Sequence, residues 1–323
     1  MVDLSYYAKR MYDGIITGPL SPATGFGGVY TNTNEEQTRR GWELTVNGTP
    51  VKTDNWRWDI GFNWTTYATY YTKLDSIYSG KDPWVKVGNR VDAFVSKDLV
   101  KDPKNGELIY SNGRLQYSNY NSNFGWTDPN FVWGVNTTLK YKAFSLFMSV
   151  DGVVGGLMDT RTESYMWQSG IHPNSVTPER AADVATPGSS NFLGKGEKVV
   201  SGSVTYDAFG NITSDSRVFA PNDVYSTYKQ YIIDLHSSSA WGGNGSPADT
   251  YSKTFFKLRE ISLTYNIPGK YLKGWAKAGS VSFVGQNVLL WAKQFKYSDP
   301  DGGVEDFADP SVRYLGGNIK FTF

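Results

Sequence analysis

Hydrophobic and polar residues alternate with a period of two along much of the chain, and this pattern is typical of β-strands. It is clearest at residues 56–64 (WRWDIGFNW), where aromatic or aliphatic side chains occupy every even position and polar or small residues every odd one. The final residues, 311–323 (SVRYLGGNIKFTF), repeat it, with Leu315, Ile319, Phe321 and Phe323 on one face. Strands of this kind, aromatic on one side and polar on the other, indicate lipid on one face and water on the other.

Eight segments carry the alternation. They are residues 4–16, 39–49, 56–69, 131–141, 144–153, 253–267, 279–290 and 311–323. Within residues 253–267 the phase of the alternation changes, which predicts a β-bulge near Arg259 and Glu260.

The connections between these segments alternate in length. Residues 17–38, 70–130, 154–252 and 291–310 are long and predicted to be irregular, whereas residues 50–55, 142–143 and 268–279 are short turns. Membrane barrels have long extracellular loops and short periplasmic turns. We therefore predict an all-β fold that forms part of an antiparallel, up-and-down transmembrane β-barrel in the cell outer membrane, with both chain ends on the periplasmic side.

Composition agrees with strands that cross a membrane. Aromatic residues make up 15% of the 323 positions, which suits the aromatic girdles of a barrel, although carbohydrate-binding β folds share this enrichment. The chain has no run of the roughly 20 apolar residues that a membrane-spanning helix needs. A net charge of +1 argues against a nucleic-acid partner, and the absence of cysteine excludes disulfides and thiolate metal sites.

The polar face supplies the candidates for residues that line a barrel lumen, because the alternation directs the tryptophans toward lipid. These lumen-facing candidates are Glu43, Asn47, Arg57, Asp59, Asn63, Asn136 and Lys140. If the tryptophans faced the lumen instead, they would be platforms for stacking sugar rings.

No group of residues predicts an enzyme or a cofactor site. His172 and His236 both fall in the longest loop, and we interpret them as solvated loop histidines. The acidic run at residues 299–309 (DPDGGVEDFAD) makes Asp299, Asp301 and Glu305 calcium candidates, because hard cations bind clustered oxygens. The run lacks EF-hand spacing, so an ordinary acidic extracellular loop is the alternative.

Several segments resemble one family, the SusC/RagA-like TonB-dependent transporters of the Bacteroidetes outer membrane. The segments are 41–50 (GWELTVNGTP) with 56–64, 126–134 (WTDPNFVWG) with 141–146 (YKAFSL), 255–268 (FFKLREISLTYNIP), 285–287 (GQN), 297–300 (YSDP) and the final strand. The resemblance implies that the chain is the C-terminal third of a barrel of about 22 strands. It implies that the signal peptide, the TonB-engaging segment and the plug domain of the whole protein lie outside residues 1–323.

The same resemblance implies a function. The whole protein would take up a large nutrient, an oligosaccharide or a peptide, with a SusD-like surface lipoprotein as partner and the TonB complex acting through the missing N-terminal part. Tyr314, Ile319, Phe321 and Phe323 resemble the terminal signal that the barrel-assembly machinery recognises. Two alternatives are a self-contained eight-stranded outer-membrane barrel and a soluble carbohydrate-binding β-sandwich, whose strands are buried against a second sheet.

Overall fold

An eight-stranded antiparallel sheet dominates the computed structural model, which describes residues 1–236, 246–302, 305 and 311–323. In order across the sheet, its strands are β1 (Val2–Met11), β4 (Glu36–Lys52), β5 (Trp56–Lys73), β10 (Phe131–Tyr141), β11 (Phe144–Val154), β18 (Phe255–Ile267), β19 (Ala278–Ala292) and β20 (Tyr314–Thr322). Each of the eight segments with alternating hydrophobicity contributes one strand. The first is shorter than predicted, because Asp13 adopts a left-handed conformation (φ 52°) in an Asp-Gly turn and ends β1.

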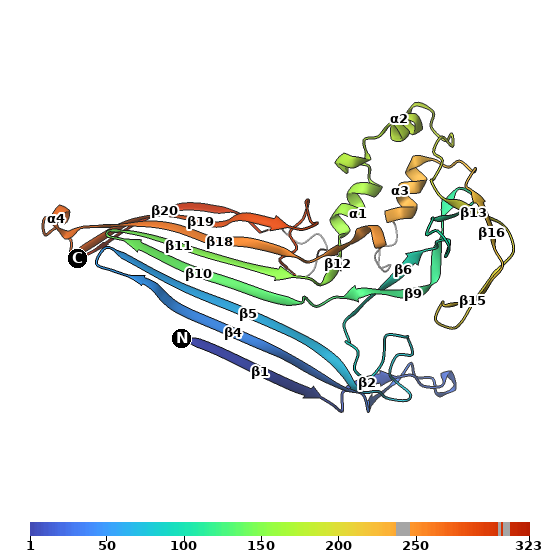
Figure 1. The fold of residues 1–323 in the computed structure, drawn as a ribbon, viewed down its shortest axis with the longest axis horizontal. Coiled ribbons are helices and arrows are strands. Elements are labelled where there is room, and N and C mark those ends of the chain that lie inside the picture. Colours follow the sequence, from blue (N-terminus) through green and yellow to red (C-terminus); the bar gives the residue numbers. More distant parts are fainter. Residues whose placement is uncertain (237–245, 303–304, 306–310) are drawn as a thin grey trace.

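The sheet does not close on itself. β1 and β20 lie at its two edges and do not pair with each other. Both chain ends lie at the end of the sheet that carries the short turns, and the long connections gather at the other end (Figure 1). A self-contained eight-stranded barrel would require β1 to pair with β20, so this alternative does not fit the structure.

The register across the sheet brings the apolar positions of neighbouring strands together. Trp64 pairs with Leu44 on one side and Trp133 on the other, and Leu263 pairs with Phe283. Several large side chains of this face are exposed, Phe283 at 70% among them, whereas Trp64 and Trp133 are half-buried. The sheet therefore presents an extended apolar surface that the described part of the chain leaves uncovered.

The predicted β-bulge in β18 is present. Leu258 pairs with Val150 and Glu260 with Ser149, so that Arg259 is the extra residue. The inserted residue restores the phase of the alternation, and the apolar residues before and after it share one face.

The described part of the connection between β19 and β20 contains no helix or strand, but the first three long connections are not irregular, and for them this prediction was wrong. They contain η1 (Pro22–Thr24), η2 (Pro173–Ser175), η4 (Pro247–Asp249), α1 (Arg161–Gln168), α2 (Pro178–Ala185) and α3 (Tyr228–His236), together with the short strands β2 (Ile15–Gly18), β3 (Val29–Asn32), β6 (Ala93–Leu99), β7 (Ile109–Ser111), β8 (Arg114–Leu115), β9 (Tyr117–Trp126), β12 (Leu157–Asp159), β13 (Glu197–Ser201), β14 (Val204–Tyr206), β15 (Ile212–Asp215), β16 (Val218–Pro221) and β17 (Thr250–Ser252). A further short helix, α4 (Gly269–Leu272), lies in the turn between β18 and β19. No helix among the described residues has the length and apolar character needed to cross a membrane.

The elements within residues 93–126, 157–252 and 293–302, as far as these are described, gather at the end of the sheet opposite the chain termini (Figure 1). We call them the loop layer. Parallel pairing of β7 with β13 joins connections that are distant in sequence. Most of the buried apolar residues lie here, including Ile109, Tyr110, Leu115 and Ile232. A β-sandwich would instead have its core between two sheets, so that alternative also does not fit.

Candidate functional site

A cleft of about 610 Å³ opens in the loop layer where α1, α3, β17 and the connection after β19 meet. Its walls carry several aromatic side chains, among them Trp167, Tyr231 and Tyr251. Lys293 and Lys296 lie along the part contributed by the connection after β19. None of these five residues was a candidate from the sequence, because no pattern in the chain links them.

The N-terminus of α1 fixes one wall of the cleft. Thr160 precedes the helix, is fully buried, and its hydroxyl accepts a hydrogen bond from the backbone N–H of Glu163 (3.3 Å). A Thr followed three residues later by Glu is the capping-box signature of a helix start. This signal was present within a region predicted to be irregular, and it places Glu163 one turn before Trp167.

The two histidines are buried against Trp167, so the prediction of solvated loop histidines was wrong. His172 is 2% and His236 4% exposed. The Trp167 indole is stacked between them, with ring centroids 4.0 Å from His172 and 4.9 Å from His236 and interplanar angles of 11° and 8°. Tyr297 meets His172 edge-on at 5.1 Å. The result is a column of rings along the cleft.

Each histidine is oriented by a carboxylate. His172 Nε2 lies 3.0 Å from Glu163 Oε1, and its Nδ1 accepts the backbone N–H of Asn174 (3.1 Å). Nδ1 of His172 therefore carries no proton, and Nε2–H donates to Glu163. His236 Nδ1 lies 2.7 Å from Asp249 Oδ1.

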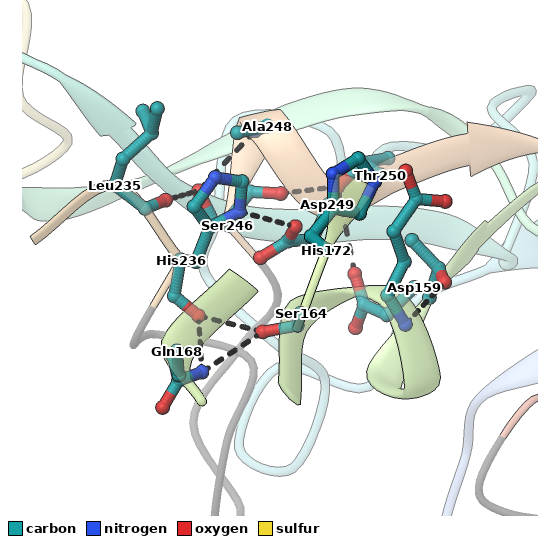
Figure 2. A network of polar contacts seen from close by, with 12 residues as sticks. Asp159, Ser164, Gln168, His172, Leu235, His236, Ser246, Ala248, Asp249 and Thr250 are labelled. Atoms are coloured by element: carbon teal, nitrogen blue, oxygen red, sulfur yellow. Dashed lines mark hydrogen bonds and ion pairs between the residues drawn. The ribbon is translucent and has the colours of Figure 1, made fainter. Parts of the chain in front are cut away.

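Hydrogen bonds to the last carbonyls of α3 hold the helices together (Figure 2). Ser164 Oγ and Gln168 Nε2 donate to the main-chain oxygen of His236 at 2.7 and 2.9 Å, and Ser246 Oγ donates to that of Leu235 at 2.5 Å. The last carbonyls of a helix have no partner within the helix. Side chains from α1 and from Ser246, the residue before η4, supply the partners here, and they set the position of α3 beside the cleft.

The chemistry of the cleft suits binding. Ser164 donates to the backbone oxygen of His236, a contact different from the hydroxyl-to-imidazole hydrogen bond of a catalytic triad. Burial, reinforced by the nearby Glu163 carboxylate, raises the pKa of Tyr251, so its hydroxyl stays protonated at neutral pH. The Tyr251 hydroxyl donates to Glu163, and the lysine ammonium groups offer hydrogen-bond donors beside apolar ring surface.

The acidic run lies next to this cleft and binds cationic side chains. Lys257 Nζ contacts Asp299 Oδ2 at 2.6 Å and Asp301 Oδ2 at 2.9 Å, and its side chain is 1% exposed. Arg259 donates to both oxygens of Asp301, Nη2 to Oδ1 at 2.7 Å. We call these four residues the acidic latch, because they attach the connection after β19 to β18.

The third calcium candidate lies elsewhere. Glu305 Oε2 accepts the backbone N–H of Thr162 (3.1 Å) in the first turn of α1. Asp306 and Asp309 of the same run lie outside the described residues. Among those described, no group of three or more carboxylate or histidine side chains is arranged to hold a metal ion.

The seven lumen-facing candidates lie on the sheet face opposite the tryptophans. Asn47 and Asn136 both pair with Gly61, and Arg57 pairs with Lys140. An ion pair joins Arg57 Nε to Asp59 Oδ2 at 2.7 Å. This shared polar face agrees with the alternation, and its contact with a lumen stays a prediction.

The proposed assembly signal lies on the edge strand β20. Phe321 and Phe323 contact the exposed Trp275, with ring centroids 4.8 and 5.2 Å apart, and Ile319 lies on the same face as Phe321. Tyr314 lies on the opposite face, paired with Gln286. Recognition by an assembly machinery stays a prediction.

Comparison with known proteins gives a likeness of fold. No family model and no curated protein matches the sequence. Among solved structures, the RagAB peptide importer in its closed-closed state matches with a TM-score of 0.63, 15% identity and coverage of the whole of this chain. The RagAB peptide transporter and the importer's open-open state match with a TM-score of 0.62 at the same identity. The chain spans about a third of the length of these neighbours.

Proposed function

We propose that this chain forms the C-terminal part of the barrel wall of a SusC/RagA-like TonB-dependent transporter, which takes up a large nutrient across the outer membrane. The observation that carries the proposal is the open sheet: among the described residues, nothing covers its apolar face and no strand pairs with its two edges, β1 and β20. Lipid would cover the apolar face, and further strands of the same polypeptide would pair with both edges.

The distribution of the connections supports the same proposal. Short turns lie at one end of the sheet and the folded loop layer at the other (Figure 1). In an outer-membrane barrel the loop layer would be extracellular. Its cleft would meet a ligand before the polar face of the sheet does.

The mechanism is transport without covalent chemistry. The loop layer and a SusD-like lipoprotein would capture the ligand outside the cell, and the TonB complex would open the path by acting on a plug domain. The polar face with Asn47, Asp59 and Asn136 would form part of the path. Peptides are the favoured cargo, because the structures with this fold are of peptide importers.

The experiment is uptake by the source bacterium with and without the gene for the full polypeptide. We expect the deletion strain to lose uptake of a radiolabelled peptide mixture, and the gene to restore it. A protonophore should abolish the restored uptake, because TonB draws on the energy of the inner membrane. If the deletion strain lost only the uptake of oligosaccharides, the proposed cargo would be an oligosaccharide instead of a peptide. Unchanged uptake of both, with the protein found outside the membrane fraction, would refute the proposal.

A further inference from the structure

The two lysines of the cleft have no anionic partner among the residues that the structure describes. Lys293 and Lys296 are exposed, and their ammonium groups make no hydrogen bond or ion pair with any residue in the described ranges. Lys257 and Arg259, at the opposite side of the same connection, are both paired with Asp301. Asp299 and Asp301 are thus engaged by the latch, and among the described residues no carboxylate neutralises the two cleft lysines.

The carboxylate inside the cleft already has partners other than these lysines. Glu163 accepts from Nε2 of His172 and lies beside Tyr251, and its side chain is only 10% exposed. A ligand would therefore meet two available ammonium groups and a carboxylate that is already hydrogen-bonded. This charge distribution favours an anion.

The aromatic column presents edges to a ligand. Both faces of the Trp167 indole are covered, by His172 and by His236, so this ring has no face on which a sugar could stack. The edge of an aromatic ring is electropositive. The indole N–H of Trp167 makes no hydrogen bond within the described part of the chain, and it is a further donor for an anionic oxygen.

We propose that this cleft binds an acidic peptide. Its carboxylate would lie between Lys293, Lys296 and the Trp167 N–H, and its apolar side chains would pack against Tyr231 and Ile232 of α3. The inference rests on the proposed transport function and deepens it, since it specifies the substrate class and the place of capture.

The test is calorimetric binding to the purified full-length transporter in detergent. The probes are a synthetic peptide rich in Glu and Leu, the same peptide with Gln in place of Glu, and oligogalacturonate as an acidic sugar. The variant is Lys293→Gln/Lys296→Gln. Its matched control, Lys52→Gln/Lys270→Gln, removes two exposed lysines at the opposite end of the sheet.

We expect the cleft variant to bind the acidic peptide about tenfold more weakly, which corresponds to the loss of two partly exposed charge pairs. The control should bind like the wild type, the Gln peptide should bind weakly to all proteins, and added salt should reduce the wild-type affinity. Trp167→Phe, which keeps a ring and removes the N–H donor, should weaken binding in the same direction.

Other results would overturn the inference. Equal affinity of the cleft variant and the wild type for the acidic peptide would exclude this site, and tighter binding of oligogalacturonate would exclude the peptide class. Binding is measured in vitro and uptake in cells, so the two proposals fail separately. If cells import peptides and the lysine substitutions leave peptide binding unchanged, only the assignment of the binding site to this cleft is refuted.

Discussion

At the scale of single residues, the most unusual group is Lys257, a lysine with almost no exposure on a strand of the large sheet. Its charge is offset by Asp299 and Asp301, which arrive from the connection after β19. A buried charge is costly unless it is paired. The ion pairs therefore hold this connection against β18, and we expect this attachment to depend on pH.

We predict that acidification releases the acidic latch. Hydrogen bonds from Arg259 lower the pKa of Asp301 against the effect of burial. At Asp299 burial acts to raise the pKa, but hydrogen bonds from Lys257 and Ser311 outweigh it and the pKa is lowered. Carboxylates with a depressed pKa in the folded state stabilise it at neutral pH, and this contribution is lost as the pH falls below about 4.

Hydrogen exchange of residues 293–302, corrected for intrinsic rates, measures this release between pH 7 and pH 3. We expect protection to fall with pH in the wild type and to be low at both values in Lys257→Gln, which lacks the central cation. Protection that is independent of pH in the wild type would argue that the latch does not hold this connection.

At the scale of elements, α1 depends on local signals and on tertiary contacts together. Its start is encoded by the N-cap residue Thr160, whose hydroxyl accepts the backbone N–H of Glu163. Its orientation comes from Ser164 and Gln168, which bind the end of α3. Disturbing the cap should therefore affect both the helix and the cleft.

We predict that Thr160→Ala lowers the stability of α1 by about 1 kcal/mol, the usual contribution of an N-cap side chain. Thr160→Ser keeps the hydroxyl acceptor and should behave like the wild type. The measurements are hydrogen-exchange protection of residues 161–168 and Trp fluorescence, which reports on the stacked Trp167 ring. Equal effects of the Ala and Ser substitutions would assign the loss to the missing methyl group instead of the cap.

At the scale of the whole molecule, the two faces of the sheet differ in the surroundings they require. Phe62 and Asn63 are consecutive residues in the middle of β5 and project to opposite faces. Phe62 pairs with Val46 and Val135 on the apolar face, whereas Asn63 accepts a hydrogen bond from Thr45 on the polar one (3.1 Å). This pair allows the same substitution to be compared on both faces.

We predict that Phe62→Arg lowers the free energy of unfolding of the full-length protein in lipid bilayers by about 2–4 kcal/mol, the cost of an arginine facing lipid near the midplane. Asn63→Arg should cost less than about 1 kcal/mol, because a polar lumen hydrates the charge. Urea titrations of the two variants measure the difference. Equal costs would contradict the assignment of the apolar face to lipid.

The sequence by itself determined the strands of the large sheet, their two faces and the bulge at Arg259. Side chains of successive residues in a strand point to opposite sides whatever the strand pairs with, so these features depend only on local order. The start of α1 is also predictable from the local sequence of residues 160–163. The local sequence did not distinguish a part of a larger barrel, a small closed barrel and a sandwich, because these folds differ in which strand edges pair.

Only the tertiary structure decided the cleft. His172 and His236 are far apart in the chain and come to the two faces of Trp167 because α1 packs on α3. The sequence made Asp299 and Asp301 candidates for a calcium site. In the folded chain their partners are the side chains of Lys257 and Arg259. Burial and charge pairing arise from contacts between segments distant in sequence. The alternation of hydrophobic and polar residues along the chain carries no information about such contacts.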